Sequence, residues 1–263
     1  MKTTMNLLVR ATAPVAAAFL LVNCATEPIT GRRQLNLVSS GQEMELGLTT
    51  FDKLKKETPI SRDPAMNALV QSVGKRIAAV AELPNAQWEF VVFESKEANA
   101  FCLPGGKVGV YTGILPITKD ELGMATVIGH EVGHAVAHHG GERMSQAMAA
   151  QYGGKAVDLA TSHADPRWQQ AATLAYGVGA QVGVLLPYSR VQESAADRIG
   201  LTYMARAGYD PEAAVAFWER FAEYSRQQGS SGPAWLRTHP ADETRIQQIK
   251  KWLPEAKQQY RSR

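Results

Sequence analysis

The stretch Ile128–Gly140 (IGHEVGHAVAHHG) constrains the fold more than any other part of the chain, because it places four of the six histidines within ten residues of an apolar segment. The residues between the histidines are mostly valine, alanine and glycine, and this pattern predicts a helix that is buried on most of its surface. A buried imidazole without a partner costs roughly 1–3 kcal/mol. The sequence therefore predicts that something binds these histidines inside the protein.

Residues His130 to His134 have the form H-E-x-x-H. Residues four apart on a helix share one face and lie about 6 Å apart along the axis, so both imidazoles can converge on one ion. Glu131 lies one step round the helix from His130, beside the ion, where a base can take a proton from an attacking water. Short patterns also recur by chance, and the alternative is a pair of surface histidines on a helix.

A catalytic zinc with two histidine ligands needs a third ligand from the protein. Glu193 and Asp197 follow about sixty residues later, and their spacing of four places them on one helix face. Glu193 could complete the ligand set, and Asp197 could accept a hydrogen bond from the distal nitrogen of a zinc-bound histidine. Alone, this pair is typical of a solvated helix face; together with H-E-x-x-H it predicts a site for one zinc ion.

His138 and His139 are not needed for that site, since a helix that runs past the ion carries them away from it. We interpret both as cations that lie favourably at a helix C-terminus.

The rest of the chain predicts an α-rich α+β domain. Capping boxes at Ser40 and Thr118 begin two helices, and Gly140-Gly141 ends the histidine-rich one. Strand-forming residues occupy Trp88–Phe93 and Lys107–Thr112. Helices are expected at about 40–56, 64–83, 118–139, 190–206, 211–228 and 240–263, with two more between 142 and 186 and a flexible loop at 229–233.

The N-terminus resembles a bacterial lipoprotein signal. Two basic residues, Lys2 and Arg10, precede the apolar run Ala11–Val22, which is too short to cross a bilayer as a helix. Cys24 then follows a leucine at the lipobox position, although Asn23 stands where a small residue is usual. We interpret Cys24 as the lipidated residue; the alternative is a simple cleaved signal. Ala25 is not aspartate, which by the same resemblance implies the outer membrane.

These boundaries predict a signal peptide at 1–23, an extended tether at 24–38 and one domain at 39–263. A hydrophobic content of 45% with 20% charged residues is typical of a globular protein. Without residues 1–23, 26 basic residues face 25 acidic ones, so the charge gives no indication of a nucleic-acid partner. If Cys24 carries lipid, Cys102 has no disulfide partner, and we interpret it as a small buried hydrophobic residue.

The combination of HEVGH with ExxxD resembles the gluzincin metallopeptidases of the CAAX prenyl protease, HtpX and Oma type. Over residues 39–250 the chain resembles the bacterial periplasmic lipoprotein branch, a BepA-like catalytic domain without repeats. The stretches that carry the resemblance are NAFCLPGGKVGVYTGIL, HHGGERMS, PYSRVQESAADRIGL and THPADETRI. Ala195 departs from the family by replacing a common acid, but it does not stand at a ligand position.

The resemblance implies a zincin-type domain with one zinc ion bound by His130, His134 and Glu193, and with Glu131 as general base. It also implies endopeptidase activity on misfolded or misassembled envelope proteins. His239 of the THP motif would approach the metal, either to stabilise the oxyanion or to cover the zinc at rest. The alternative for His239 is a residue that only precedes the helix at Pro240.

In the resembling family, a strand like Lys107–Thr112 is the edge strand beside the cleft and flanks the active-site helix. Val108, Gly109 and Val110 would then hold an extended substrate by main-chain hydrogen bonds. No membrane-spanning pair is recognisable in the sequence, which excludes the intramembrane architectures of the wider family.

We therefore expect a zinc endopeptidase of protein quality control, lipid-anchored at the periplasmic face of the outer membrane. Its partners would be unfolded or misassembled proteins and the membrane, with no nucleic acid. The alternative from another class is a chaperone whose zinc is structural, but a structural zinc normally has four protein ligands and no adjacent base.

Overall fold

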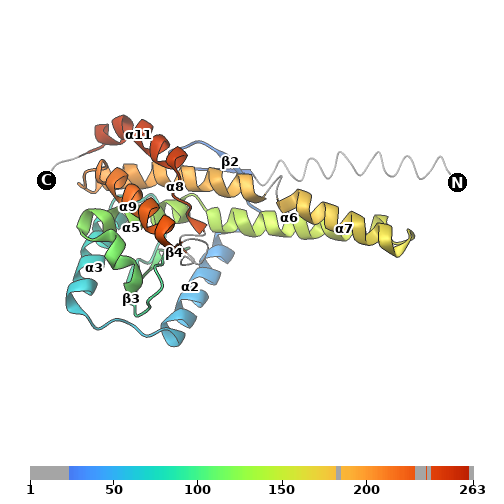
Figure 1. The fold of residues 1–263 in the computed structure, drawn as a ribbon. Helices are drawn as coiled ribbons and strands as arrows, with labels where there is room; N and C mark the ends of the chain where they lie inside the picture. The colour runs from blue at the N-terminus through green and yellow to red at the C-terminus, as the bar shows by residue number, and fades with distance from the viewer. Residues whose placement is uncertain (1–23, 182–184, 229–234, 236–237, 261–263) are drawn as a thin grey trace.

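The computed structural model describes residues 24–181, 185–228, 235 and 238–260. As predicted, it is an α-rich α+β fold in which helices pack around a small sheet (Figure 1). The helices are α2 (Ser40–Glu57), α3 (Pro64–Ala78), α4 (Leu115–Thr118), α5 (Glu121–Val136), α6 (His139–Ala160), α7 (Pro166–Ala180), α8 (Leu186–Arg206), α9 (Ala213–Gln228) and α11 (Glu243–Gln258). The strands are β1 (Cys24–Thr26), β2 (Arg33–Leu35), β3 (Glu89–Phe93), β4 (Ala100–Leu103) and β5 (Lys107–Tyr111).

The three-stranded sheet has the order β3-β5-β4, with β5 parallel to β3 and antiparallel to β4. The prediction that β5 is the edge strand is therefore wrong, because both of its sides are paired. The edge strand that packs against α5 is β4. β4 was not predicted, since it is only four residues long and its AFCL sequence carries no alternation of polar and apolar residues.

α5 is the central helix, and every residue from Gly123 to Val136 is buried. Its N-cap is Asp120, whose side chain accepts a hydrogen bond from the Gly123 amide at 2.8 Å, and not Thr118, which belongs to α4. The helix ends at Val136 because His138 adopts a left-handed conformation (φ 53°). Gly140 and Gly141, predicted to end this helix, lie in the first turn of α6.

The other predicted helix starts are close to those observed. Asp63 caps α3 as predicted, with its carboxylate accepting from the amides of Ala65 and Met66. The N-cap of α2 is Ser39, one residue before the predicted Ser40, because Ser39 and Gln42 form the reciprocal pair of hydrogen bonds.

Glycines let α5 approach α8 closely. A Cβ atom on Gly133 would lie 2.8 Å from the Ala196 carbonyl oxygen, and one on Gly200 would lie 2.9 Å from the His130 amide nitrogen. Because larger side chains would push the two backbones apart, these glycines set the distance between the helix that carries the H-E-x-x-H motif and the helix that carries Glu193.

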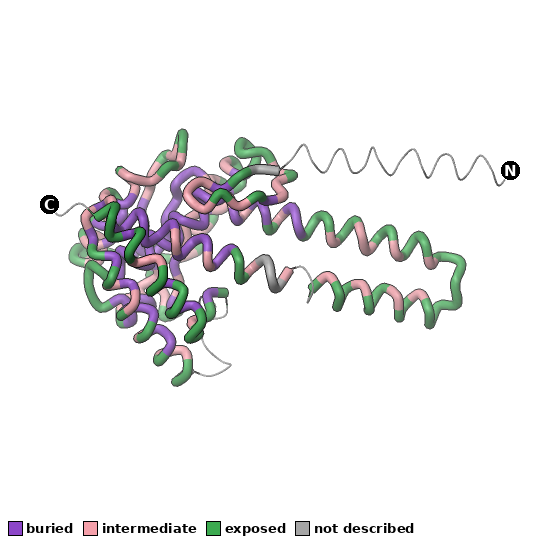
Figure 2. Tube along the Cα trace, turned by 90° about the horizontal axis from the view of Figure 1, so that it is seen from above, coloured by how far each residue is buried: buried purple, intermediate pink, exposed green. Residues whose placement is uncertain are grey.

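α6 and α7 form a long hairpin that projects from the rest of the molecule (Figures 1 and 2). The two predicted helices and the break at Asp165-Pro166 are confirmed, with the Asp165 side chain capping α7. α7 has no buried residue (Figure 2).

The segment after Cys24 differs from the extended tether that we predicted. β1 and β2 pair as an antiparallel hairpin, and Glu27 between them is only 2% exposed. Glu27 contacts Arg32 and His139 inside the protein, which local sequence patterns do not indicate. The predicted signal peptide at 1–23 and the predicted loop at 229–233 lie outside the described residues.

Within the described ranges, no helix combines the length and the hydropathy needed to cross a bilayer.

Candidate active site

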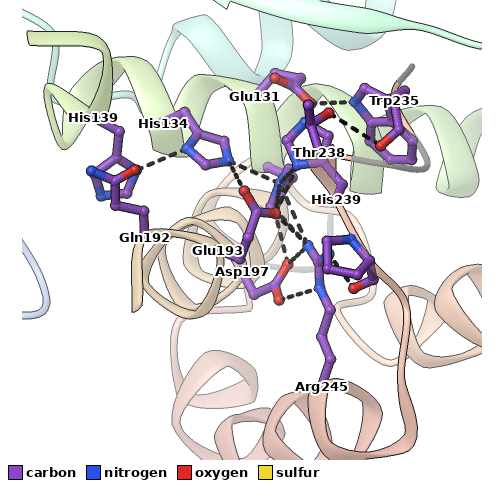
Figure 3. A network of polar contacts seen from close by, with 12 residues as sticks. Glu131, His134, His139, Gln192, Glu193, Asp197, Trp235, Thr238, His239 and Arg245 are labelled. Carbon is purple, nitrogen blue, oxygen red and sulfur yellow. Dashed lines mark hydrogen bonds and ion pairs between the residues drawn. The ribbon is translucent and has the colours of Figure 1, made fainter. Parts of the chain in front are cut away.

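The predicted site residues come together from three parts of the chain. α5 supplies His130, Glu131 and His134, and α8 supplies Glu193 and Asp197. His239 approaches from the segment before α11, and Figure 3 shows it beside Glu131 and Glu193. All six side chains lie inside the protein, with at most 8% of each residue exposed.

Four of these side chains turn a nitrogen or an oxygen toward one point. The Nε2 atoms of His130 and His134 are 3.1 Å apart, and the two Glu193 oxygens lie 3.3 and 3.2 Å from them. His239 Nδ1 is 2.7 Å from Glu193 Oε2 and 3.1 Å from His130 Nε2. Atoms of all four residues lie within 4.8 Å of one another, so the group could hold one metal ion.

The chemistry of this donor set fits zinc. The Nδ1 atoms of His130 and His134 both have partners on the outside of the cluster, which leaves their Nε2 lone pairs turned inward toward each other. Two such nitrogens 3.1 Å apart need a hydrogen or a metal ion between them, and a metal ion can satisfy both of them and the Glu193 carboxylate at once. Ligand atoms at about 2.0 Å from a tetrahedral zinc are about 3.3 Å apart, close to the distances observed here.

Asp197 occupies the position that its spacing from Glu193 predicts. Its Oδ1 atom is 2.9 Å from His130 Nδ1, so it can accept the hydrogen of the distal nitrogen. Arg245 of α11 donates to both carboxylate oxygens of Asp197, at 2.7 and 2.8 Å, and its guanidinium lies 3.5 Å from the centre of the Trp218 ring. The Asp197 carboxylate is thus fixed on two sides.

Burial and charge act in opposite directions on the pKa values of these groups. Burial favours the neutral carboxyl, but charge interactions and hydrogen bonds with the histidines around it hold the pKa of Glu193 well below its usual range. Burial likewise opposes ionisation of Asp197, yet Arg245 lowers its pKa. Burial also holds the pKa of His134 well below the ordinary value. Asp197 and Glu193, in contrast, raise the pKa of His130 to about 9 against the effect of burial. The carboxylates and His134 are therefore in the forms that bind zinc, and a bound zinc would take the place of the proton on His130.

Glu131 lies beside the donor group and not within it. Trp235 Nε1 donates to Glu131 Oε1 at 2.8 Å, and His239 Nε2 is 3.7 Å from the same oxygen (Figure 3). Trp235 also stacks on Trp218, with ring centroids 5.9 Å apart. One carboxylate oxygen of Glu131 is held by the indole, and the side chain is oriented next to the place where a metal would bind.

Trp235 and Arg245 also belong to the site, although they were not predicted from the sequence. Both residues flank the THP motif that identified His239. Their closeness to that motif was the signal available in the sequence. Their partners come from α5 and α8, more than forty positions away, and no local pattern predicts that.

The interpretation of His138 and His139 as cations at a helix C-terminus is wrong for His139, which is the first residue of α6. It fits His138, which follows the C-cap Ala137 of α5 and has its pKa raised by Glu43. The two histidines join α5 to α6, and His139 is fully buried. Its Nδ1 lies 2.8 Å from His134 Nδ1, and burial lowers its pKa. His138 pairs instead with Glu43 of α2, at 2.7 Å.

A cleft opens beside the cluster and is bordered by β4. Its lining includes Phe101, Cys102, Glu131, Trp235 and His239. The predicted substrate strand does not border it: Val108, Gly109 and Val110 are buried in the central strand. Cys102, predicted to be a small buried hydrophobic residue, is partly buried: it packs against the core and also lines this cleft.

Comparisons with known proteins bear on this geometry. Residues 64–253 match the family model described as "Peptidase family M48". Over 232 residues, 87% of this chain, the sequence is 38% identical to the mitochondrial metalloendopeptidase OMA1 of Schizosaccharomyces pombe. It is 31% identical over 256 residues, 89% of this chain, to the protein of the same name in Saccharomyces cerevisiae.

The sequence is also 28% identical over 224 residues, 84% of this chain, to the beta-barrel assembly-enhancing protease of Escherichia coli K12. The matched regions span 66%, 70% and 46% of these three relatives, so the chain corresponds to part of each relative's length.

Proposed function

Since the chain belongs to peptidase family M48, a family of zinc metallopeptidases, we propose that it is a zinc-dependent endopeptidase that cleaves misfolded or misassembled proteins of the cell envelope. The observation that carries this proposal is the inward-facing set of two histidine nitrogens and a carboxylate, with Glu131 held beside it.

His130, His134 and Glu193 would hold the zinc ion. Asp197 fixes the ring of His130 through its distal nitrogen, and Arg245 fixes Asp197 in turn. When bound, zinc supplies a Lewis acid that polarises the scissile carbonyl and makes a water molecule more acidic.

Glu131 would be the general base. Trp235 holds one of its oxygens, which leaves the other to accept a proton from the attacking water and to deliver it to the leaving amine. The short step along the helix from His130 to Glu131 keeps this carboxylate next to the reacting carbonyl without making it a ligand.

His239 would regulate access to the metal. Its Nδ1 lies within the donor group, so in this conformation it would be a fourth protein ligand, and a catalytic zinc needs an open position. We propose that His239 covers the zinc at rest and moves aside for substrate, where it could then stabilise the oxyanion.

An extended peptide would bind along β4. This strand pairs with β5 on one side only and borders the cleft that contains Glu131 and His134. Main-chain hydrogen bonds to such an edge bind peptides with loose sequence preference, which suits unfolded substrates. The relative named a beta-barrel assembly-enhancing protease is consistent with substrates in the cell envelope.

We also propose that Cys24 is lipidated and anchors the protein at the periplasmic face of the outer membrane. The basic residues, the short apolar run and the leucine three positions before the cysteine support this proposal. Mass spectrometry of the mature N-terminus should find a diacylglyceryl group on Cys24. An unmodified N-terminus at Cys24, or a cleavage site elsewhere, would contradict it.

Casein cleavage tests the peptidase proposal. We expect cleavage that stops when zinc is chelated and returns when zinc is added. Glu131→Gln should bind zinc normally and lose activity by about 100- to 10,000-fold, because amide oxygen is a poor base. A wild-type protein that binds zinc and unfolded casein without cleaving it would instead support a chaperone with a structural metal.

A further inference from the structure

A second buried polar cluster lies next to the proposed zinc site. Glu27 comes from the turn between β1 and β2, His139 and Glu142 from the first turn of α6, and Gln192 from α8; each is at most 2% exposed. The side chains of Glu27, His139 and Glu142 lie close enough together to be considered as metal ligands.

Arg32 makes a second metal at this cluster unnecessary. Its Nε donates to Glu27 Oε1 at 2.7 Å, and its Nη1 donates to Glu142 Oε1 at 2.8 Å. The guanidinium therefore supplies the positive charge that the two buried carboxylates need. Glu142 also accepts a hydrogen bond from Gln192 Nε2 at 2.7 Å. The cluster therefore needs no metal ion to be stable.

The cluster is connected to the zinc site through one pair of imidazole rings. Glu27 Oε1 is 3.0 Å from His139 Nε2, and His139 Nδ1 is 2.8 Å from His134 Nδ1. Figure 3 shows His139 beyond His134, on the side away from Glu131 and His239. These contacts form a chain from the Glu27 carboxylate through His139 to Nδ1 of His134.

Hydrogen-bond chemistry limits which nitrogens of His139 and His134 can carry hydrogens. A carboxylate that is paired with arginine only accepts hydrogen bonds, so His139 Nε2 must carry a hydrogen. Only one hydrogen fits between two nitrogens 2.8 Å apart. If His134 Nδ1 carries it, His139 is neutral and His134 is a neutral ring whose lone pair is on Nε2, which points into the donor group.

We propose that Glu27 and His139 are positioning residues for the metal centre: together they hold His134 in the tautomer and orientation that bind zinc through Nε2. This inference rests on the proposed function, in which His134 is a zinc ligand. It makes the two histidines of the motif equivalent, because His130 is held by Asp197 directly and His134 is held by Glu27 through His139.

The hairpin that carries Glu27 is therefore part of the metal site. The Glu27 amide donates to the Arg32 carbonyl at 2.8 Å, and the Gly31 amide donates to the Glu27 carbonyl at 3.1 Å. These bonds hold the carboxylate only three residues after Cys24, the proposed anchor.

Zinc affinity of the full chain, measured by competition with a chromophoric chelator, tests this inference. Glu27→Ala should weaken zinc binding about 10- to 100-fold, as expected for loss of a partner that orients a ligand. Glu27→Gln retains an acceptor oxygen for His139 and should restore most of the affinity. Glu142→Gln is the matched control, because it removes the other carboxylate on Arg32 without touching His139; it should change the affinity by less than about threefold.

A spectroscopic measurement on the wild type supplies a second test that does not depend on any variant folding. In ¹⁵N-histidine NMR spectra of the zinc-loaded chain, His134 should carry its hydrogen on Nδ1 and His139 on Nε2. A hydrogen on His139 Nδ1, or unchanged zinc affinity in folded Glu27→Ala, would overturn the inference. If the wild type itself fails to bind zinc or to cleave casein, the proposed function fails instead.

Discussion

α5 and α7 have almost the same length, 16 and 15 residues, and opposite surroundings. Every α5 residue from Gly123 to Val136 is buried, whereas α7 has no buried residue although it carries Trp168, Leu174 and Val178. Both helices also contain glycines. Apolar composition alone therefore does not decide which helix enters the core of this protein.

The glycines show what distinguishes the two helices. A Cβ atom on Gly123 or Gly133 of α5 would lie less than 3.0 Å from a neighbouring backbone atom, while a Cβ atom on Gly177 or Gly179 of α7 would meet nothing within 4 Å. In α5 the absence of side chains allows close packing that holds the site rigid. In α7 it contributes only conformational freedom.

Two tryptophans provide the largest expected contrast between the core and the hairpin. Trp218 is 2% exposed, and Trp168 of α7 is 73% exposed. Trp218→Ala should lower the free energy of unfolding by about 3–5 kcal/mol, because it leaves a cavity beneath Arg245 and Trp235. Trp168→Ala should change it by less than about 0.5 kcal/mol. Urea denaturation followed by circular dichroism measures both, and equal losses would refute the contrast.

A pair of glycine substitutions should sharpen the comparison with a smaller effect. Gly133→Ala places a methyl group against the Ala196 carbonyl and should destabilise the protein by about 1–3 kcal/mol, with weaker zinc binding as α5 and α8 separate. Gly177→Ala should instead stabilise α7 by about 0.5–1 kcal/mol. Hydrogen exchange resolved by helix distinguishes these outcomes. Slower exchange in α7 is expected for Gly177→Ala, and unchanged exchange around α5 for Gly133→Ala would contradict the packing argument.

The smallest expected effect concerns the junction between α5 and the α6–α7 hairpin. The hydrogen bond that His138 donates to the Glu43 carboxylate raises the pKa of His138 against the opposing effect of burial. Protonation of His138 thus favours the folded state, and this contribution is present below the ordinary pKa of about 6.5 and disappears as the pH rises through the folded value.

Asparagine tolerates the left-handed backbone of position 138. His138→Asn should therefore lower the free energy of unfolding by about 0.5–1 kcal/mol at pH 5.5 and by less at pH 8.5; the effect is small because the His138–Glu43 pair is partly exposed to solvent. Thermal melts at the two pH values measure the difference. Glu43→Gln should remove the same pH dependence. If His138→Asn lost more stability at pH 8.5 than at pH 5.5, protonation of His138 would not favour the folded state.

The sequence was most informative where spacing alone determines geometry. The four-residue spacing in H-E-x-x-H and in Glu193–Asp197 predicts two helix faces, and the structure brings these faces together. The predicted α-rich α+β fold and the predicted gluzincin family are confirmed. The Asp63 cap and the break at Asp165-Pro166 were also predictable, because each depends only on neighbouring residues.

What the sequence could not indicate depends on partners that are distant in the chain. Buried Glu27 contacts His139, more than one hundred positions away, and the roles of Trp235 and Arg245 depend on α5 and α8. The misplaced edge strand has a related cause: strand order depends on the unpredicted β4. His139 was misinterpreted because one left-handed residue, His138, redirects the chain and returns the next imidazole to the site.

The central claim is that His130, His134 and Glu193 bind one zinc ion. Zinc content per chain after exhaustive dialysis tests it most directly. We predict about one zinc in the wild type and in Glu131→Gln, and a loss of most of the metal in folded Glu193→Ala, because that variant loses a ligand and Glu131→Gln does not. Full zinc content and unchanged affinity in Glu193→Ala would contradict the account.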